Sequence, residues 1–392
     1  MKRRKALIAI SVFFLIYIMN VCIFFNLSDI KYKFMKDVPG VIVKISNEQR
    51  SYNAFPKVIR TGDISVNPMG ALLAVWYSGN AHVDTNSDGQ IWGAFSCDDG
   101  RTWSPPALVY DDPVLDCRNI GIAKAPNGTI ILFFAKVLVQ GSSWTWKDFG
   151  FIKSSDHGHS WSPFTSLISN TSSIVPGVGN GNGYGDPIMI QGKIYILCYS
   201  RPDPPAFPHY SSFLLTSSDN GTTWEYKSKI NKNSTIPANE ADFLLGNASG
   251  SDLIFGFTRT MDTSGDLLHY FESSDHGVSW PVLFSTNIWG QSPDLFQLSD
   301  GRYVVAYRAR NDQGIYFIGY FTLDAAFPSF SNKRETLTRL VQKCLVKTTY
   351  GQGRSDMGYP SIVSVGSGKI LVVFYDIDAG GVFSKLIDEK NL

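Results

Sequence analysis

The sequence predicts an all-β fold, a six-bladed β-propeller, preceded by one N-terminal transmembrane helix. Three observations support this prediction: a motif that occurs four times at intervals of about 60 residues, a strand–turn–strand pattern that occurs six times, and one long apolar segment at the start of the chain. The composition agrees, because aromatic residues make up 14% of the 392 residues and charged residues only 18%. Such a balance, with 35 glycines and 19 prolines, favours short strands and tight turns over helices.

Residues 1–28 are expected to form a cytoplasmic tail and a membrane anchor. The basic residues 2–5 precede an apolar run from Ala6 to Phe25, which at about 20 residues is long enough to cross a bilayer as a helix. The positive-inside rule keeps the basic end in the cytoplasm, so the rest of the chain is expected in the lumen or outside the cell, as in a single-pass type II protein. A cleaved signal peptide, which would leave the protein secreted, is the alternative, but no small-residue cleavage site follows the apolar run. Residues 29–50 are assigned to a stem and residues 51–392 to the propeller.

Glycosylation sequons agree with this location. Cysteine is sparse: apart from Cys22 in the apolar run four remain, which is enough for one or two disulfides but not for a framework of bridges. The sequons lie at Asn26, Asn127, Asn170, Asn220, Asn233 and Asn247.

The motif that organises the chain is Ser-x-Asp-x-Gly-x-x-Trp. Its Asp can accept hydrogen bonds from N–H groups of its own turn, its Gly supplies a positive φ, and its Trp presents a large apolar face to neighbouring elements. These roles are structural, so the motif is expected to mark a hairpin turn and not a catalytic site. The four copies begin at Ser96, Ser154, Ser217 and Ser273 and end at Trp103, Trp161, Trp224 and Trp280.

The strand–turn–strand pattern sets the number of blades. Each copy has two apolar or alternating runs around a turn that contains glycine. Six copies predict six blades, of which the last two lack a recognisable motif. The paired runs cover residues 55–59 with 71–76, 121–124 with 129–134, 187–190 with 193–199, 241–245 with 252–258, 293–298 with 302–307 and 360–365 with 369–375.

The recurring motif is the Asp box, or BNR repeat, and six blades with Asp boxes resemble the sialidase (neuraminidase) superfamily over about Ser51 to Asp378. The resemblance implies a glycoside hydrolase that releases terminal sialic acid or a related acidic sugar from glycoconjugates. In this family a Tyr attacks the anomeric carbon, because the carboxylate of the sugar would repel an anionic nucleophile, and a neighbouring Glu activates the Tyr. Arginines hold the carboxylate through paired hydrogen bonds, and an Asp is the acid/base catalyst.

The resemblance also implies which residues form the site. Tyr359, which opens the sixth blade, corresponds to the nucleophile, and Glu240, which opens the fourth, corresponds to its activating partner. Arg259 at the end of the fourth-blade hairpin and Arg310 after the fifth correspond to two of the three arginines, with Arg308 as the alternative to Arg310.

The acid/base Asp is expected in the loop 80–89, between the first hairpin and the first Asp box. Asp84 is preferred, and Asp88, which precedes Gly89, looks like a turn residue. His82 in the same loop is expected to bind substrate or to tune the Asp, with a structural role as an equal alternative.

The first of the three arginines is missing. Sialidases usually begin the first blade with Arg-Ile-Pro, where this chain has Ala54-Phe55-Pro56. Arg60 lies too far along the strand to replace it, whereas Arg118, which opens the second blade, is a candidate replacement. Two alternatives therefore stay open: a propeller that binds glycans or proteins without turnover, and a glycosidase for a different sugar.

Other function classes find no support. A formal charge of +1 without a basic face argues against nucleic acid. The six His residues have no ligand spacing with Cys, and no phosphate-binding loop occurs, so neither a metal site nor a cofactor is expected. The expected partners are a glycan substrate and, through the N-terminal helix, a membrane.

Overall fold

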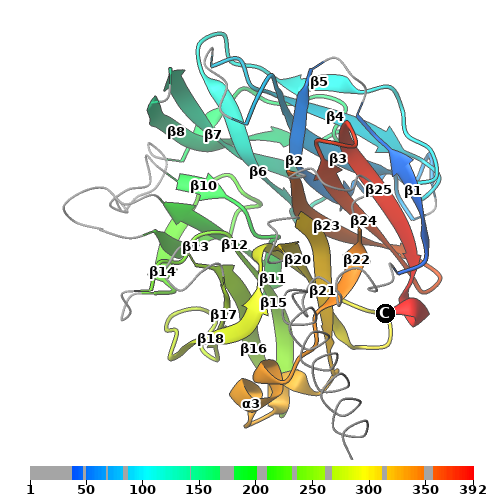
Figure 1. Ribbon diagram of the computed structural model, residues 1–392. Helices are drawn as coiled ribbons and strands as arrows, with labels where there is room; N and C mark the ends of the chain where they lie inside the picture. Colours follow the sequence, from blue (N-terminus) through cyan, green and yellow to red (C-terminus); the bar gives the residue numbers. More distant parts are fainter. Residues whose placement is uncertain are drawn as a thin grey trace, which may run out of the picture.

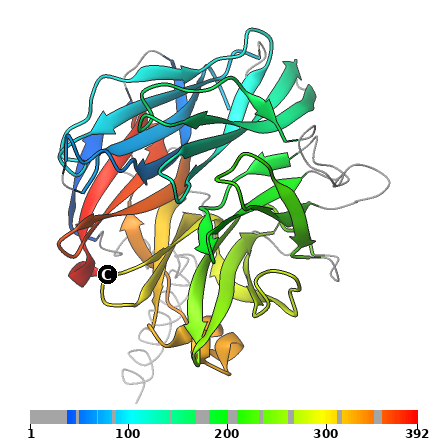
Figure 2. The same cartoon turned by 180° about the vertical axis from the view of Figure 1, so that it is seen from behind.

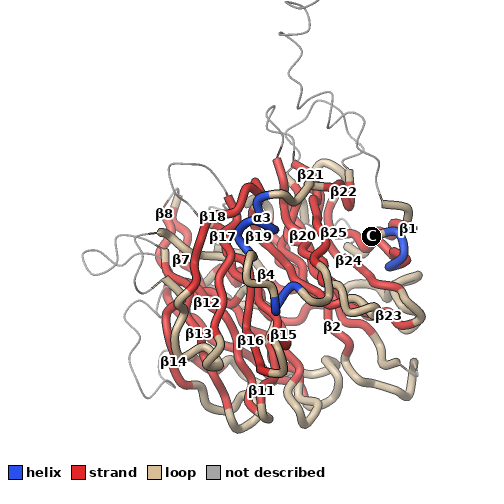
Figure 3. The backbone as a smooth tube through the Cα atoms, turned by 90° about the horizontal axis from the view of Figure 1, so that it is seen from below, coloured by secondary structure: helices blue, strands red, loops and turns tan. Residues whose placement is uncertain are grey.

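The computed structural model shows six antiparallel sheets arranged as the blades of a propeller (Figure 1). It describes residues 38–46, 50–67, 69–82, 87–141, 143–167, 181–200, 210–231, 236–260, 267–310, 316–347 and 356–392. The all-β prediction and the six blades are confirmed, and within the described residues helix is confined to short segments (Figure 3). The predicted transmembrane helix lies outside the described residues, and within those residues no helix is long and apolar enough to cross a membrane.

The first three blades follow one another along the chain. Blade one consists of β2 (Tyr52–Arg60), β3 (Leu72–Gly79), β4 (Gln90–Ser96) and β5 (Ala107–Tyr110). Blade two consists of β6 (Asp116–Lys124), β7 (Ile130–Gln140), β8 (Ser143–Ser154) and β9 (Thr165–Ser166). In blade three both β10 (Gly181–Gly183) and β11 (Ile188–Ile190) pair with β12 (Lys193–Ser200), which is followed by β13 (Ser211–Ser217) and β14 (Glu225–Lys229).

The other three blades repeat this pattern. Blade four consists of β15 (Ala241–Ala248), β16 (Ser251–Arg259), β17 (Leu267–Ser273) and β18 (Val282–Trp289). Blade five consists of β19 (Gln291–Gln297), β20 (Tyr303–Arg310), β21 (Tyr316–Leu323) and β22 (Lys343–Val346), with the short helices η2 (Phe327–Ser329) and α3 (Lys333–Thr338) before its last strand. Blade six consists of β23 (Met357–Gly366), β24 (Lys369–Asp376), β25 (Gly381–Asp388) and β1 (Gly40–Lys44), and η3 (Glu389–Asn391) follows β25.

The ring is closed by the first strand of the chain. β1 pairs antiparallel with β25, with Gly40 opposite Ile387 and Lys44 opposite Phe383. Figures 1 and 2 show this blue strand beside the red end of the chain. β1 falls inside the range that the sequence assigns to the stem, so the propeller includes residues 40–44. The sequence around β1 has one short apolar run and no adjacent turn followed by a second strand. It therefore lacks the strand–turn–strand pattern from which the other blades are predicted.

The inner strands of the blades contact one another around the axis, β2 with β6 and β23, and β19 with β15 and β23. Apolar side chains fill the spaces between blades: Leu73 and Val75 of blade one belong to the same buried cluster as Leu132 and Phe134 of blade two. This packing between adjacent blades fixes the relative positions of the inner strands, which carry most of the candidate site.

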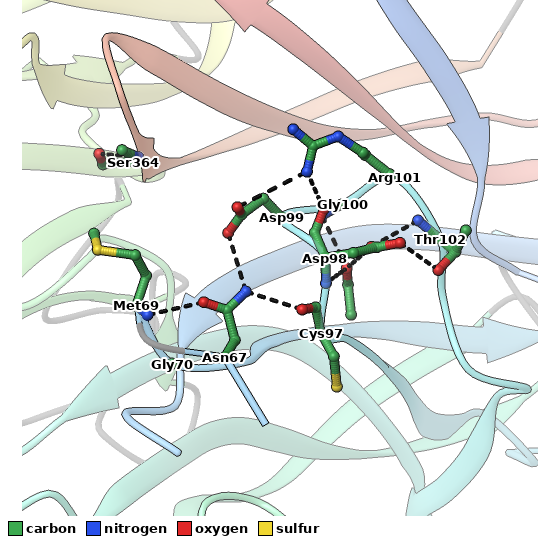
Figure 4. Close-up of polar contacts among 12 residues, drawn as sticks. Asn67, Met69, Gly70, Cys97, Asp98, Asp99, Gly100, Arg101, Thr102 and Ser364 are labelled. Carbon is green, nitrogen blue, oxygen red and sulfur yellow. Dashed lines mark hydrogen bonds and ion pairs between the residues drawn. The ribbon is translucent and has the colours of Figure 1, made fainter. Parts of the chain in front are cut away.

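Each Asp box forms the turn between the third and fourth strands of its blade. In the first box the Asp98 carboxylate accepts hydrogen bonds from the backbone N–H of Thr102 at 2.8 Å and from its hydroxyl at 2.6 Å (Figure 4). Gly100 has a φ of +83°, as the motif requires. The structural interpretation of the motif is therefore confirmed.

The box turns also join neighbouring blades. A Cβ added to Gly100 would lie 2.6 Å from Cδ1 of Leu371 in blade six, and Trp103 donates its indole N–H to Ser384 of the same blade at 3.1 Å. The third box repeats the arrangement: Trp224 lies edge-on to Phe133 of blade two, with 5.2 Å between ring centroids. Each box therefore packs on the preceding blade, which explains why glycine and tryptophan recur in it.

Asp98→Ala is expected to lower the free energy of unfolding by about 1–2 kcal/mol, because it removes the three hydrogen bonds that its carboxylate accepts from Ser96 and Thr102 in the turn. Denaturation in urea measures this change, with Glu225→Ala, an exposed substitution on β14, as the control. The turn lies at the end of the blade remote from the starts of the inner strands. An unchanged free energy of unfolding in Asp98→Ala would contradict the structural role of the carboxylate.

Candidate active site

The candidate residues gather at one end of the propeller. Tyr359 is the third residue of β23, Glu240 directly precedes β15, and Arg259 is the last residue of β16. Because neighbouring strands are antiparallel, the start of each inner strand and the end of the second strand lie at the same end of a blade. The Asp boxes lie at the opposite end.

Four inner strands carry a β-bulge near their start. The pairing register shifts between Ala54 and Lys57 in β2, and corresponding shifts occur in β6, β19 and β23. Within these bulges one non-glycine residue has a left-handed backbone, a strained conformation that concentrates at functional sites. The four residues are Phe55, Asn119, Ser292 and Tyr359, with φ between 49° and 60°.

A pocket on the axis connects three of these bulges. Phe55, Asn119 and Tyr359 all line it, and aromatic rings form much of its wall. Pockets that combine apolar walls with a few polar groups are typical of ligand sites. The complete lining is Phe55, Pro56, Lys57, Asn119, Ile120, Tyr184, Tyr199 and Tyr359.

The Tyr359 hydroxyl donates a short hydrogen bond to Oε1 of Glu240. Nη1 of Arg259 lies 3.1 Å from the same oxygen, and the Ser292 hydroxyl donates to Oε2 at 2.7 Å. Glu240 is only 2% exposed, whereas Tyr359 is partly exposed above it. The structure therefore brings together three residues that the sequence analysis selects, and adds Ser292 to them.

The surroundings assign the shared proton to the tyrosine. Burial and the charge of Glu240 raise the pKa of Tyr359 well above its ordinary value. Burial opposes ionisation of Glu240 as well, but Arg259 and the hydroxyls of Tyr359 and Ser292 outweigh it and lower the pKa of Glu240 below its ordinary value. At neutral pH a protonated phenol thus faces an ionised carboxylate, which is the arrangement of a nucleophile with its general base.

Of the two arginines on β20, Arg308 lies beside the nucleophile segment. A Cβ added to Gly358 would lie 2.8 Å from Cδ of Arg308, so glycine lets the arginine pass next to Tyr359. Its Nη2 donates to Oδ1 of Asp356 at 2.9 Å, and its guanidinium lies 3.7 Å from the ring centroid of Tyr316. Arg310 is exposed, and its guanidinium lies 5.9 Å from the same centroid.

Arg118 is buried, with 1% exposure. Its guanidinium donates to Asp116 at 2.6 Å and to the Tyr77 hydroxyl at 2.9 Å, and lies 4.2 Å from the Trp144 ring centroid. These contacts leave no exposed face for a substrate carboxylate. Arg118 stabilises the wall of blade two instead of replacing the missing arginine.

The loop 80–89 is described only at its two ends, and Asp84 lies outside the described residues. Asp88 accepts a hydrogen bond from the Asn80 side chain at 3.0 Å and forms an ion pair with Arg50 at 3.2 Å, as a residue that fixes the base of a loop would. His82 lies near Phe55, with 5.4 Å between ring centroids, and its side chain is 51% exposed.

Phe55 fills the blade-one side of the pocket. Its ring centroid lies 4.7 Å from that of Tyr359 and 5.4 Å from that of Tyr375. Ala54, at the position of the missing arginine, is fully buried. Where the resemblance to sialidases implies an arginine, the wall of this pocket is therefore aromatic and uncharged.

A buried lysine lies on the axis beneath the pocket. Nζ of Lys57 binds Oδ1 of Asp186 at 3.0 Å and Oδ1 of Asp294 at 3.2 Å, and Asp242 accepts a hydrogen bond from the backbone N–H of Asp186 at 2.8 Å. Burial favours the neutral amine, but the three carboxylates raise the pKa of Lys57 above its ordinary value. Lys57 thus links blades one, three and five as a cation.

Comparison with known families matches residues 70–372 to the BNR repeat-like domain. The chain belongs to the BNR repeat-like domain family. Its fold is shared with a protein of unknown function from Dyadobacter fermentans, at 20% identity and a TM-score of 0.71 over 90% of this chain and 98% of that one.

Sialidases have the same fold as this BNR repeat-like protein. The Hadza microbial sialidase Hz136 matches at 14% identity and a TM-score of 0.63, over 87% of this chain and 66% of that chain. The sialidase of Trypanosoma rangeli, solved with the inhibitor DANA, matches at 14% identity and a TM-score of 0.64, over 88% of this chain and 59% of that chain. The BNR repeat-like protein thus spans about two thirds or less of the length of these two sialidases.

Four residues of the candidate site in this BNR repeat-like protein do not follow from the resemblance: Phe55, Lys57, Ser292 and Asp356. A signal for two of them is present in the sequence, because Phe55-Pro56, Ser292-Pro293 and Tyr359-Pro360 all lie at the start of an inner strand. Proline is confined to bulges and edges within sheets, so three such pairs indicate three bulges that face one axis. Lys57 and Asp356 have no comparable signal.

The BNR repeat-like protein is expected to lose stability as the pH rises from about 4 to about 7. Burial and the charge of Asp186 raise the pKa of Asp242 to about 7. A carboxyl whose pKa is raised in the folded state contributes most to the free energy of unfolding below its unfolded pKa of about 3.9. This contribution is lost as the pH rises through the pKa of the folded state. Urea denaturation between these pH values measures the slope, and Asp242→Asn should flatten it; an unchanged slope in the variant would contradict the assignment.

Proposed function

We propose that this protein is a retaining exo-glycosidase that acts on terminal sugars of glycoconjugates, with Tyr359 as the nucleophile and Glu240 as its general base. The observation that supports this most directly is the hydrogen bond between Glu240 and the hydroxyl of Tyr359, which lines the pocket. A tyrosine with a purely structural role needs only one hydrogen-bond acceptor for its hydroxyl. Here the acceptor is itself held by Arg259 and Ser292, which fixes its orientation and its charge.

In the proposed reaction the Tyr359 oxygen attacks the anomeric carbon while Glu240 takes the phenolic proton. The acid/base catalyst protonates the leaving oxygen as its bond breaks, and a glycosyl-tyrosine remains. Water then attacks the same carbon and loses a proton to the acid/base catalyst, while the proton held by Glu240 returns to the departing phenolate. Two displacements retain the anomeric configuration.

The likeness to sialidases suggests sialic acid or a related acidic sugar as the substrate. Arg259 and Arg308, whose side chains are 18% and 12% exposed, are the cations of the described site that can reach a carboxylate. In this proposal they hold the carboxylate without a third arginine. Asp84 is the acid/base catalyst that the resemblance suggests.

A glycosidase for a sugar without a carboxylate is the second candidate, and the aromatic wall at Phe55 favours it. Four cations in the described part of the site each have a carboxylate oxygen at 3.1 Å or less: Lys57, Arg118, Arg259 and Arg308. An aromatic ring binds the apolar face of a sugar and offers nothing to an anion.

Turnover on a panel of fluorogenic aryl glycosides tests both candidates. With the full-length chain in detergent, the first candidate predicts release from a sialoside and the second predicts release from neutral glycosides. Retention of sialylated glycans on the immobilised protein without release from any glycoside would contradict the enzymatic proposal and favour a binding propeller.

We further propose that the propeller lies in the lumen or outside the cell, anchored by residues 1–28 as a type II protein. The basic cluster before the apolar run supports this orientation. Protease digestion of intact membranes should spare the propeller when it is luminal and remove the tail. If protease added to sealed vesicles whose cytoplasmic face points outward digests the propeller, the type II orientation is contradicted.

A further inference from the structure

We propose that His82 is the acid/base catalyst of this site and that Tyr52 and Asp356 are positioning residues that hold its ring. This inference rests on the proposed glycosidase function. It replaces the carboxylic acid expected in the loop 80–89 with an imidazole, and it assigns a task to a network that the Tyr359–Glu240 pair does not use.

The Tyr52 hydroxyl connects the other two groups. It donates a hydrogen bond to Oδ2 of Asp356 at 2.7 Å and lies 2.6 Å from Nδ1 of His82. A hydroxyl has one proton, and here it is directed to the carboxylate, so the tyrosine oxygen accepts from an Nδ1–H of the imidazole. Nε2 is then the ring nitrogen that is free to exchange a proton with substrate.

Asp356 is held as a carboxylate. Besides Tyr52, it accepts hydrogen bonds from Nη2 of Arg308 at 2.9 Å and from the Tyr375 hydroxyl at 2.8 Å. Burial disfavours its charge, but His82, Arg308 and the two tyrosines lower the pKa of Asp356 well below its ordinary range. A fixed carboxylate behind an imidazole orients the ring, and here one tyrosine hydroxyl lies between the two groups and transmits that orientation.

Three further contacts hold His82. Nη2 of Arg118 donates to its backbone carbonyl at 3.1 Å. Its ring lies 5.4 Å from Phe55 and stacks on Trp144 at 6.4 Å, both measured between centroids. The buried ion pair of Arg118 therefore supports the loop, and an exposed imidazole is held in one place at the rim of the pocket.

The position suits proton transfer to a leaving group. The ring of Phe55 lies near both groups, with its centroid 5.4 Å from that of His82 and 4.7 Å from that of Tyr359, so the imidazole and the nucleophile border the same aromatic ring. A sugar bound against that ring would have Tyr359 toward its anomeric carbon and His82 toward its leaving oxygen.

The proton balance closes over the two displacements. In the first, the Nε2 proton of protonated His82 moves to the glycosidic oxygen as its bond to the anomeric carbon breaks. In the second, neutral His82 takes a proton from the attacking water. His82 is thereby returned to its protonated form, and the aglycone and the sugar leave with the elements of one water molecule.

The test compares His82→Ala with Asp84→Asn on substrates with different leaving groups. General acid catalysis contributes about 100- to 10000-fold when the leaving group is poor and little when it is good. His82→Ala is therefore expected to lower kcat at least about 100-fold on a glycan with a sugar leaving group, and far less on an activated aryl glycoside. Added azide, which needs no general base, should restore turnover of the aryl substrate.

Tyr52→Phe keeps the ring and removes only the hydroxyl, and it should reproduce the same dependence on leaving group at smaller amplitude. If these residues had only a structural role, each substitution would lower kcat on both substrates alike, and azide would not restore it. His159→Ala, an exposed histidine in the second Asp box, is the matched control and should leave both rates unchanged.

The proposal is overturned when Asp84→Asn shows the loss on poor leaving groups and the azide rescue while His82→Ala does not. Failure of the proposed glycosidase function would look different. The wild-type chain would then release no sugar from any glycoside, or Tyr359→Phe would keep full activity, and the assignment of His82 would be wrong as well.

Discussion

Tyr359→Phe is expected to lower kcat at least about 1000-fold, because it removes the attacking oxygen and leaves the ring. Loss of a nucleophile from an assembled site has effects of this size or larger. The ring of Tyr359 packs against Phe55 and Tyr184, at centroid distances of 4.7 Å and 5.8 Å, and phenylalanine preserves both contacts. Stability should therefore stay close to that of the wild type.

The measurement is kcat on the best glycoside of the panel, together with a denaturation curve of each variant. Tyr226→Phe is the matched control, since Tyr226 lies on the outer strand β14 of blade three, away from the pocket. Glu240→Gln should cause a comparable loss, because the phenol then lacks a base. Activity of Tyr359→Phe within about tenfold of wild type would exclude Tyr359 as the nucleophile.

Lys57→Met is expected to lower the free energy of unfolding by about 3–5 kcal/mol at pH 7. Methionine fills a similar volume, so the effect comes from charge: Asp294, which is fully buried, and Asp186 lose their cation. Removing one partner of a buried ion pair leaves an uncompensated charge in a medium of low dielectric. The variant should recover part of its stability at pH 5, where the carboxyls with raised pKa values can be protonated.

Urea denaturation at the two pH values measures this effect. Lys193→Met changes an exposed lysine at the start of β12 and should alter stability by less than about 0.5 kcal/mol. A loss that is equal at pH 5 and pH 7 would show that packing, and not the charge of Lys57, stabilises the axis.

The architecture could be predicted from the sequence because its signals are local and repeated. Four Asp boxes and six strand pairs each encode their own turn, and each box carries the glycine and tryptophan that pack on the preceding blade. β1 has no such signal, because its pairing with β25 joins residues more than three hundred positions apart. The closing strand is therefore visible only in the structure.

The candidate site could be predicted in part. Glu240, Arg259 and Tyr359 follow from motif positions, and the structure brings them together. Arg308 and Arg310 lie two residues apart on the same face of β20, so the choice between them depends on which position along the strand meets Gly358, and the strand pattern alone does not give that position. Arg118 looked like a replacement cation by its place at the start of β6, but its burial with Asp116 depends on a tertiary contact.

Asp356 shows most plainly what sequence reasoning lacks. It binds Tyr52, Arg308 and Tyr375, which come from blades one, five and six, so no spacing in the chain relates them. The same holds for Lys57 and its two aspartates. Networks that cross the axis arise from the order of the blades and not from any local pattern.

The most direct test of the Tyr359–Glu240 assignment is to trap the covalent intermediate. The full-length chain is incubated with fluorinated glycosyl fluorides of the sugars that it hydrolyses, digested, and analysed by mass spectrometry. The account predicts that the peptide containing Tyr359 gains the mass of one fluorinated sugar and that the label is absent from Tyr359→Phe. Attachment of the sugar to Glu240 or to another carboxylate, with turnover intact, would contradict it.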